Sequence, residues 1–600
     1  MKSAGGRGRA LPESAWLALG IVFLAALWWA CRGAPLGTAV VDDYSFLDRL
    51  RFQRPLDPFD SMGASYYWRP LSRQLYFMLI GPWLLAAPWG AALLHAVLLF
   101  ALYVLLYRSA RRGFSPPVAA AIAASPLLGE SARVLLGWPS AAQHLLAMVA
   151  VACAIHESLA GRRWTAALAA LAAVLSHDAA VIVPVALPVV AYFRTRRMRD
   201  TMISGAFAIG VLVLWAAGYT IARARGVELP PATQSGFPFG EVAGILLRVL
   251  VAHLNLEEMS GERRAFFASL YGVLVVAAVV LLSRRAARAR LVAREPVLLG
   301  GIAWFVLASA PLALLLPDWN AWRASLPALG LGVALTGLMG LASPWLAGAW
   351  VVLRLVTLGL TTPAPVTVSG TPPATPSHIS FVRLVRLQHA VDGTREALTQ
   401  RFPSLPRGAD VRFWGMPQLC EVGFQGARAV RVWYGDSTIT WNKFGGMEGM
   451  ERTIDALVEF ETKGARVAMV VEPRALELLR QGMRSFMAQD LASADSLFDL
   501  AGRTQPAGSN QFFGTVAINR SAVAYNRGDF ARADSLNRLG AELGNPSPAH
   551  HMMVARLAMQ AGDRTKAVAA VRSALMLNPN DVEGRRLAQM LGMSVSAGAP

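Results

Sequence analysis

The feature that most constrains this chain is a series of long apolar segments that fills its first 360 residues. A helix needs about 20 consecutive apolar residues to cross a bilayer core, and eleven segments approach that length. They are Trp16–Ala30, Trp89–Tyr107, Pro117–Leu136, Ala141–Leu159, Trp164–Leu175, Ala179–Phe193, Met202–Ile221, Phe266–Leu282, Val297–Leu316, Ala324–Leu341 and Trp345–Leu360. We therefore expect a multi-pass membrane protein with about eleven spans, two of them short.

The composition excludes an ordinary soluble enzyme, because 54% of the 600 residues are hydrophobic and 16% are charged, whereas soluble domains carry about 25% charged residues. The formal net charge is +19. The basic residues are arginines in short loops between apolar segments, so we expect them to set membrane orientation and not to bind nucleic acid. With three cysteines, two of them in apolar runs, no disulfide framework is expected.

The arginine-rich loops predict the orientation of the chain. If the spans alternate, four such loops fall on one side, which the positive-inside rule makes cytoplasmic. They contain Arg108/Arg111/Arg112, Arg162/Arg163, Arg194/Arg196/Arg197/Arg199 and Arg284/Arg285/Arg288/Arg290/Arg294. We expect the first span to be an uncleaved anchor with a cytoplasmic N-terminus. The near absence of lysine favours a GC-rich bacterial source, hence an inner (plasma) membrane protein with a periplasmic C-terminal region.

The sequence predicts four parts: a transmembrane domain (1–360), a Pro/Thr-rich linker (361–378), a small soluble α/β domain (379–473) and helical repeats (474–600). Apolar runs at 411–414, 429–434 and 466–471 are expected to be strands. The fold class is therefore mainly α, a polytopic helical bundle followed by an α/β domain and helical repeats.

The repeats are visible as Gln489–Ala494, Gly528–Ala533 and Gly562–Ala567, with the third unit ending in Leu577-Asn578-Pro579. A turn, an alanine where helices approach and a period near 34 residues resemble tetratricopeptide repeats. Such repeats supply a binding surface for a protein partner or acceptor and no chemistry.

Ionisable residues near the ends of apolar segments are the candidates for function, because burying a charge there is costly. Asp42 and Asp43 follow the first span. They can supply a general base, or a base with an orienting or metal-binding partner, and a solvated helix-capping pair is the alternative. Arg69 lies among aromatic residues that include Tyr67, which suits either phosphate binding or an interfacial aromatic belt.

Three further positions fall on the same predicted external side. Glu130 and Arg133 lie one helical turn apart and can form a simple ion pair. His177 and Asp178 occupy a short turn between two apolar segments, either as a polar turn or as part of a shared cavity. Arg323 opens a later span. Together these acids and cations suit a lipid-linked phosphate donor, whose phosphate needs cations while an acceptor hydroxyl needs a base.

The order and spacing of these motifs resemble the GT-C superfamily of membrane glycosyltransferases, in particular the protein O-mannosyltransferase-like branch with tetratricopeptide repeats. The motifs that carry the resemblance are Asp42-Asp43, Tyr67-Trp68-Arg69-Pro70-Leu71, Pro126…Glu130, Ser176-His177-Asp178-Ala179-Ala180…Pro184 and Arg323-Ala-Ser-Leu-Pro327. The chain departs from the family pattern at His177 and Asp178, where the family has lysine and glutamate. With a pKa near 6.5, His177 would be a conditional cation.

The resemblance implies transfer of a sugar from a polyprenyl-phosphate-linked donor to an acceptor hydroxyl of a protein, lipid or glycan at the periplasmic face. Asp42 would be the base and Asp43 its orienting partner, or the reverse. Arg69, His177 and Arg323 would bind the lipid phosphate, with Glu130, Asp178 and Tyr67 shaping the cavity. Whether a divalent cation (Mg²⁺ or Mn²⁺) takes part stays open.

Two other functions are compatible with the sequence. A non-catalytic, membrane-anchored scaffold would display the repeats to assemble envelope machinery. A transporter or flippase would show inverted internal repeats with broken helices, and no such symmetry is visible.

Overall fold

The computed structural model describes residues 11–53, 57–63, 66–228, 237–361, 379–416, 420–444, 454–460, 467–505, 510–544, 547–578 and 581–593. The predicted linker lies outside the described residues apart from Thr361, as does Pro579 of the third repeat. The chain forms two compact units. The first contains Met1–Val366, Thr371–His389 and Val422–Arg428, and the second contains the remaining residues.

The apolar segments of the first unit are helical, as predicted. Eight helical segments of the described chain are long and apolar enough to cross a membrane. They are α1 (Glu13–Ala30), α4 (Pro88–Ala110), Pro139–Ala160 with α7 (Ala142–Ala160), Asp178–Thr195 with α9 (Ile182–Thr195), α10 (Met198–Ala224), α12 (Gly261–Leu282), Arg285–Leu315 with α13 (Arg285–Ser309), and Ala321–Ala342 with α14 (Ser325–Leu331) and α15 (Gly337–Ala342).

The other three predicted spans are also helical but depart from a simple crossing. Pro116–Leu128, which contains α5 (Pro116–Ala124), meets α6 (Glu130–Gly137) at a bend of 63°. The helices α8 (Arg163–Ser176) and α16 (Pro344–Leu360) are shorter, at 14 and 17 residues. All eleven predicted segments are therefore helical, whereas fewer than eleven are long enough to span by themselves.

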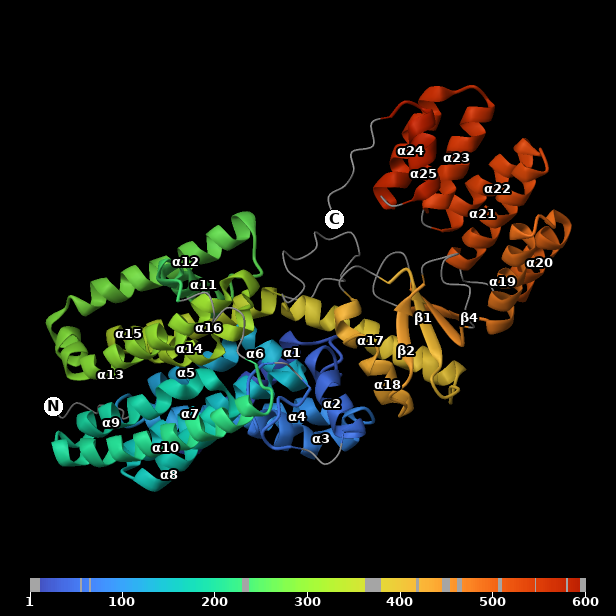
Figure 1. Ribbon diagram of the computed structural model, residues 1–600. Coiled ribbons are helices and arrows are strands. Elements are labelled where there is room, and N and C mark those ends of the chain that lie inside the picture. The colour runs from blue at the N-terminus through green and yellow to red at the C-terminus, as the bar shows by residue number, and fades with distance from the viewer. Residues whose placement is uncertain are drawn as a thin grey trace. The chain divides into compact units, whose positions relative to one another are not determined.

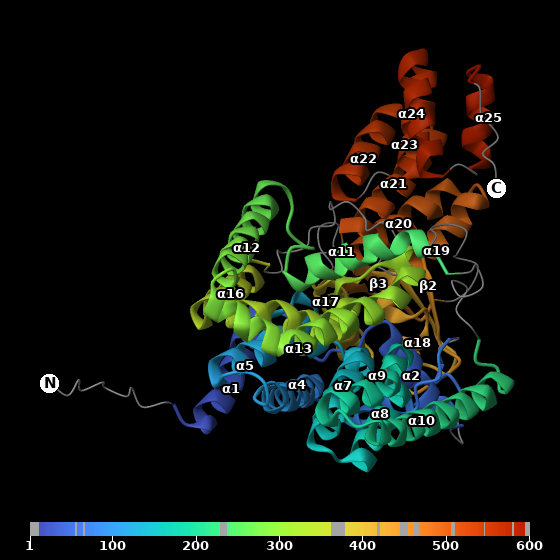
Figure 2. The ribbon, with the colours of Figure 1, turned by 90° about the vertical axis from the view of Figure 1, so that its left-hand side faces the viewer.

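Helices α7 to α10 form one group in the first unit, and α12 to α16 form a second group (Figure 1). The two groups can also be followed when the view is turned by 90° (Figure 2), and they contact each other through α14 and α7 and through α13 and α9. Helix α5 packs against α1 and α4 and, in the second group, against α15 and α16. The break between α5 and α6 is therefore inside the bundle, where free backbone groups need partners within the protein.

Asn255, in the turn after α11 (Val242–His253), supplies those partners. The Glu130 N–H donates to its Oδ1 (2.7 Å), and its Nδ2 donates to the Leu128 carbonyl (2.8 Å) on the other side of the bend. The same amide donates to the Arg354 carbonyl of α16 (3.1 Å). Asn255 is fully buried and has a φ of 60°, a left-handed conformation that asparagine tolerates better than most residues. One side chain thus ties the broken span to α16.

We expect Asn255→Ala to destabilise the first unit by about 3 kcal/mol, because buried backbone groups left without partners cost roughly 1–3 kcal/mol each. Thermal unfolding in detergent measures the effect. Ser269→Ala is the matched control, since Ser269 only donates to the Ala265 carbonyl on the exposed face of α12. Equal melting temperatures for the two variants would contradict this role of Asn255.

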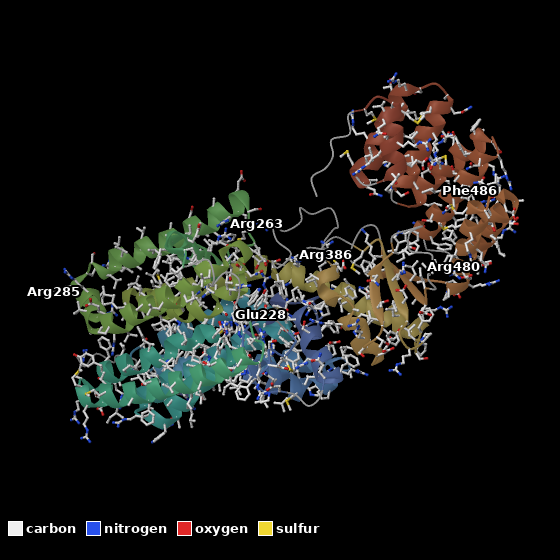
Figure 3. The ribbon with its side chains drawn as sticks, viewed as in Figure 1. Glu228, Arg263, Arg285, Arg386, Arg480 and Phe486 are labelled. Atoms are coloured by element: carbon white, nitrogen blue, oxygen red, sulfur yellow. The ribbon has the colours of Figure 1, made fainter. Side chains whose placement is uncertain are left out.

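The arginine-rich turns gather at one end of the first unit. The Arg194 guanidinium packs over Gly161, and that of Arg294 lies beside Gly113. Arg285, labelled in Figure 3, lies at this end, whereas Arg263 at the start of α12 lies at the opposite end. Helix α8 runs from Arg163 at the arginine-rich end to Ser176. His177 therefore lies at the end of the bundle opposite the arginines.

Three further elements of the first unit lie at this opposite end: α2 (Asp42–Phe52), a π-helical turn η1 (Leu71–Leu75) and α3 (Tyr76–Leu84). They precede α4, whose Arg108 end carries the first arginine-rich turn.

The second unit contains a four-stranded sheet of β1 (Asp410–Trp414), β2 (Thr440–Lys443), β3 (Ala456–Phe460) and β4 (Val467–Val471), in the order β2-β1-β3-β4. Two of the three predicted strands are present, as β1 and β4. The third prediction was wrong, because 429–434 lie in helix α18 (Arg428–Tyr434). Strands β1 and β2 are parallel, and parallel neighbours need a crossover, normally helical. The long helix α17 (Phe381–Arg401) precedes β1.

Helical hairpins follow the sheet, as expected from the repeats. Their helices are α19 (Pro473–Met487), α20 (Leu491–Thr504), α21 (Asn510–Asn526), α22 (Phe530–Leu543), α23 (Pro548–Gln560), α24 (Arg564–Leu577) and α25 (Val582–Met590). Asp490, Asp529 and Asp563 each cap the helix that follows by accepting the N–H of the third residue along (2.9–3.1 Å). The residue before each aspartate has a positive φ: Gln489 (64°), Gly528 (81°) and Gly562 (77°).

The positive φ at these turns should make the choice of residue affect stability, because an L-residue in the left-handed region is disfavoured by about 1–2 kcal/mol. A Cβ added at Gly562 would meet nothing within 4 Å, so Gly562→Ala isolates the backbone effect. We expect it to speed hydrogen exchange in α23 and α24, whereas Gln489→Gly should slow or leave unchanged exchange in α19 and α20. The reverse pattern would contradict this reading of the turns.

Candidate active site

The site begins at a strained residue just before α2. Val41 has φ 55° and ψ −122°, which is unusual for a β-branched residue. Its N–H donates to the Gly423 carbonyl (2.9 Å), and Gly423 belongs to the 422–428 segment of the same unit. Strain of this kind persists only where surrounding contacts enforce it, and it clusters at functional sites. The strained residue fixes the start of α2, where both predicted aspartates lie.

Asp43 points into the protein and is fully buried. Its Oδ2 accepts the Val40 N–H (2.8 Å), and its Oδ1 is hydrogen-bonded to the Ser140 hydroxyl. Burial raises the pKa of Asp43 to about 8, with the neighbouring Asp42 charge contributing and the two hydrogen bonds opposing the shift. At neutral pH the Asp43 carboxyl is therefore mostly protonated.

Asp42 is partly exposed and lies among cations. Burial raises its pKa, while Arg73, Arg69, Arg323 and Arg428 oppose the rise, in that order of strength. A carboxylate whose pKa is moved toward neutrality is suited to accept a proton from a substrate. The two adjacent aspartates thus have different properties: Asp42 is partly exposed among arginines, whereas Asp43 is buried and mostly protonated at neutral pH.

Arg69 and Asp178 come together from distant parts of the chain. The Arg69 Nε donates to Asp178 Oδ1 (2.7 Å), and its Nη1 donates to Gln143 Oε1 (2.8 Å). The Arg69 guanidinium also lies over the Tyr67 ring, 4.3 Å from its centroid. Arg69 is 7% exposed, and the Asp178 side chain is 30% exposed. Contacts with three residues, Asp178, Gln143 and Tyr67, therefore hold Arg69 in a single orientation.

Arg73, one turn after Arg69, was not singled out from the sequence. Its Nη1 donates to the carbonyls of Ser61, Tyr66 and Tyr67, and its Nε to Gln143. Burial and the neighbouring Arg69 lower the pKa of Arg73 to about 9, so it stays charged at neutral pH. Arg73 shapes the loop that carries Tyr67, whose own φ is 66°.

The residues that follow α10 also contact the segment that carries Tyr67. Glu228, labelled in Figure 3 at the end of α10 away from Arg285, forms a backbone bridge with Tyr66. The Arg225 guanidinium pairs with Asp57 (2.6 Å). The segment around Tyr67 is thus held between η1 and the end of α10.

His177 lies beside Arg69 and Asp178, in the turn between α8 and the Asp178–Thr195 segment. Its Nδ1 accepts the Ala179 N–H (3.1 Å), so a neutral ring carries its proton on Nε2. Burial lowers the pKa of His177 well below its usual value, and Arg69, Arg323 and Arg73 lower it further. The predicted conditional cation is therefore a neutral hydrogen-bond donor in the folded protein.

A second histidine and a tryptophan surround His177. The His144 ring lies 4.3 Å from that of His177, and the Trp322 ring packs edge-on against His144 at 4.8 Å. Arg323 lies over the Trp322 ring, 5.2 Å from its centroid. Gln143 and His144 interrupt an otherwise apolar span, a signal by which the sequence could have identified them.

Glu130 is not part of this cluster. It is 2% exposed, and its nearest charged groups are Glu258, Arg133 and Glu257. Arg133 pairs with Glu258 (3.3 Å) instead of the predicted Glu130. The structure thus brings together Asp42, Asp43, Tyr67, Arg69, His177, Asp178 and Arg323 and places Glu130 in a separate buried network. Ser65 lies outside the described residues.

The residues at the aspartate pair do not fit a metal site. Both Asp43 oxygens are engaged by protein donors, and the acid beside them is surrounded by arginines. Among the described residues, no group of three His, Cys, Asp or Glu side chains is arranged to hold a metal ion.

Comparisons with known proteins add little to this geometry. No protein-family model matches the chain, and no curated protein is similar to it in sequence. The chain is similar to the apo crystal structure of the Archaeoglobus fulgidus oligosaccharyltransferase, with a TM-score of 0.34 and 11% identity, over 74% of this chain and 65% of that chain. Similarity at this level says nothing about activity, so the function has to be argued from the residues of the site.

The buried Asp43 predicts how stability depends on pH. An unfolded aspartate has a pKa near 3.9, and the folded value is about 8, so the folded state holds an extra proton between these values. Stability from Asp43 is then complete below pH 4 and is lost as pH rises toward 8, on the order of 1 kcal/mol per pH unit.

We expect Asp43→Asn, which mimics the protonated acid, to reduce the fall in melting temperature between pH 5 and pH 8. Asp57→Asn is the control, because hydrogen bonding to Arg225 lowers the pKa of Asp57, so the stability that depends on its titration changes only in more acidic solution and the variant should keep the wild-type fall between pH 5 and pH 8. Identical pH profiles for wild type and Asp43→Asn would show that Asp43 is ionised in the folded protein.

Proposed function

We propose that the chain is a GT-C-type membrane glycosyltransferase that moves a sugar from a polyprenyl-phosphate-linked donor to an acceptor hydroxyl. The observation that carries this proposal is the convergence of a partly exposed carboxylate, Asp42, with Arg69, Arg323 and a neutral His177 at one end of an apolar helical bundle. An anionic lipid donor explains why a base and cations meet at the end of membrane-length helices.

In the proposed reaction Asp42 is the general base and Asp43 supports it. The acceptor hydroxyl gives its proton to Asp42 as its oxygen bonds to the anomeric carbon of the sugar. The bond between that carbon and the phosphate oxygen breaks, and polyprenyl phosphate leaves with the electron pair. Asp43 is buried and mostly protonated at neutral pH, so the proposal gives the role of base to Asp42. The displacement is direct and inverts the anomeric centre.

The leaving phosphate gains negative charge, and preorganised donors stabilise it. Arg323 and Arg69 supply cations, and the His177 Nε2–H supplies a neutral donor. Arg69 is already held by Asp178 and Gln143, so it needs little reorganisation when the phosphate arrives. Because the neutral ring of His177 is stable near neutral pH, its hydrogen bond does not depend on protonation in that range.

We further propose that the site faces the bacterial periplasm. Arginine-rich turns favour the cytoplasmic side of a membrane, and these turns lie at the end of the first unit opposite His177. The helical repeats would then bind a protein partner or acceptor in the periplasm.

The aspartates give the sharpest test of this function. With purified protein and a panel of radiolabelled polyprenyl-phosphate sugars, we expect Asp42→Asn to lose roughly 10²–10⁴-fold in turnover, the usual contribution of a general base. Asp43→Asn replaces a protonated acid by an isosteric amide, so we expect turnover within about tenfold of wild type, since the loss of an indirect contact has a far smaller effect than loss of the base.

Two outcomes would contradict the proposal. A loss confined to Asp43→Asn would exchange the roles of the two aspartates. If wild type turns over none of the donors while the repeats still bind a partner, the chain is the membrane-anchored scaffold that the sequence also allowed.

A further inference from the structure

The arginine-rich end of the first unit contains a pocket that the proposed reaction does not use. Four helices of one group line it: α7, α8, α9 and α10 (Figure 1). Each helix contributes one polar side chain, and in chain order these are Ser158, Arg163, Arg194 and Ser204. Because His177 lies at the opposite end of the same bundle, this pocket is separate from the candidate active site.

The two serines of the pocket are buried, yet their hydroxyl groups have no partner. Ser158 and Ser204 are 7% and 8% exposed, and in the part of the chain that the structure describes neither hydroxyl makes a hydrogen bond. A serine inside a helix can donate to the carbonyl four residues earlier, as Ser109 does to Leu105 (2.8 Å). A buried polar group without a partner is unfavourable, so the two free hydroxyls point to a ligand that accepts from them.

The two arginines give the pocket one positive charge that no acid balances. The Arg163 guanidinium pairs with Asp200 (2.6 Å). Arg194 has no acidic partner among the described residues, and its guanidinium packs over Gly161 in the turn between α7 and α8. Guanidinium and hydroxyl groups are both donors to phosphate oxygens. One unbalanced positive charge matches the single negative charge of a phosphodiester.

Apolar side chains line the pocket at a deeper level than the polar ones. Three residues further from the arginine-rich end on α8, α9 and α10, the lining residues are Ala166, Ala191 and Phe207, and three residues of a helix span about 4.5 Å. Trp164 packs edge-on against Phe207 (4.4 Å) and is 73% exposed, and Met202 of α10 is 70% exposed. A polar level beside a deeper apolar level suits a lipid headgroup and its chains, whereas a free anion would use only the polar level.

We propose that this pocket binds the phosphate of an anionic glycerophospholipid, whose acyl chains lie along α8 and α10. The phosphodiester oxygens accept from the Ser158 and Ser204 hydroxyls and from the Arg194 guanidinium. Basic pockets between transmembrane helices bind anionic headgroups on the cytoplasmic side of a membrane, and arginine-rich turns favour that side. The inference concerns a second site and does not depend on sugar transfer.

The test compares the binding of three probes to the purified full-length protein in uncharged detergent. Dioctanoyl phosphatidylglycerol is anionic, dioctanoyl phosphatidylcholine is zwitterionic, and glycerol 3-phosphate has no acyl chains. Native mass spectrometry measures the three affinities and does not depend on turnover. We expect phosphatidylglycerol to bind about tenfold more tightly than either other probe, because it alone combines a net negative charge with acyl chains.

Three variants distinguish the pocket from the general charge of this end. Arg194→Gln removes the unbalanced charge, so we expect phosphatidylglycerol to bind about 10- to 100-fold more weakly, as the loss of a hydrogen bond to a charged group allows. The double variant Ser158→Ala/Ser204→Ala breaks no hydrogen bond of the described chain, so it should fold normally and bind about tenfold more weakly. Arg199→Gln is the matched control, because Arg199 is exposed in the first turn of α10 and does not line the pocket. Its affinity should equal that of wild type.

Three results would overturn the inference. Equal losses of affinity in Arg194→Gln and Arg199→Gln would mean that surface charge attracts the lipid without a defined pocket. Equal affinities for glycerol 3-phosphate and phosphatidylglycerol would assign the pocket to a free anion. Unchanged affinity in the double serine variant would place the phosphate outside the pocket.

Discussion

The candidate site depends on the ion pair between Arg69 and Asp178, two residues that lie 109 positions apart in the chain. Arg69 sits just before η1, and Asp178 begins the segment that leads into α9, so their contact joins the first segment after α1 to the turn after α8. Gln143 of α7 accepts from both Arg69 and Arg73. A buried guanidinium is costly unless it is paired and hydrogen-bonded. The pair and the amide therefore fix the loops that present Tyr67 and His177.

The first unit contains two networks of buried charge with different roles. In the network around Glu130, Arg354 donates to the carbonyl and the hydroxyl of Ser125 (2.9 and 2.7 Å), and Asn255 joins the same helices. Arg354 is 1% exposed. These groups satisfy the backbone of a broken span. The network around Asp42 instead keeps a carboxylate partly exposed among arginines, and it includes a strained Val41. Partial exposure of the Asp42 carboxylate distinguishes this network from the buried network around Glu130.

Much of the fold follows from hydropathy, because each predicted span is an apolar run long enough to exclude other structures. The prediction of a strand at 429–434 was wrong, because a short apolar run fits a buried helix equally well. These residues lie in the connection between β1 and β2, and the parallel pairing of those strands, which the sequence does not reveal, makes a helical crossover the normal connection. Hydropathy also identified the short apolar segments that form α8 and α16, but it does not reveal the 63° bend between Pro116–Leu128 and Glu130–Gly137.

The site was partly predictable for a related reason. Asp42, Arg69, His177 and Asp178 stand out as polar residues between apolar runs, and the structure brings them together. Glu130 is also a polar residue between apolar runs, but it lies in another network, because the bend before α6 sets the direction of its side chain. Arg428 gave no signal, since it lies in a soluble stretch whose return to α2 is a tertiary contact. The neutral state of His177 could not be predicted from the sequence either, because its pKa is lowered by burial and then by three arginines from distant parts of the chain.

The central claim is that the arginines beside Asp42 bind the phosphate of a lipid-linked donor. The most direct measurement is an electron cryomicroscopy structure of the protein in a lipid nanodisc with polyprenyl phosphate. The account predicts phosphate density within hydrogen-bonding distance of Arg323 and His177, with the lipid chain running along the apolar helices. Polyprenyl phosphate bound at the arginine-rich end of the bundle instead, or no phosphate density beside Asp42 at saturating lipid, would contradict it.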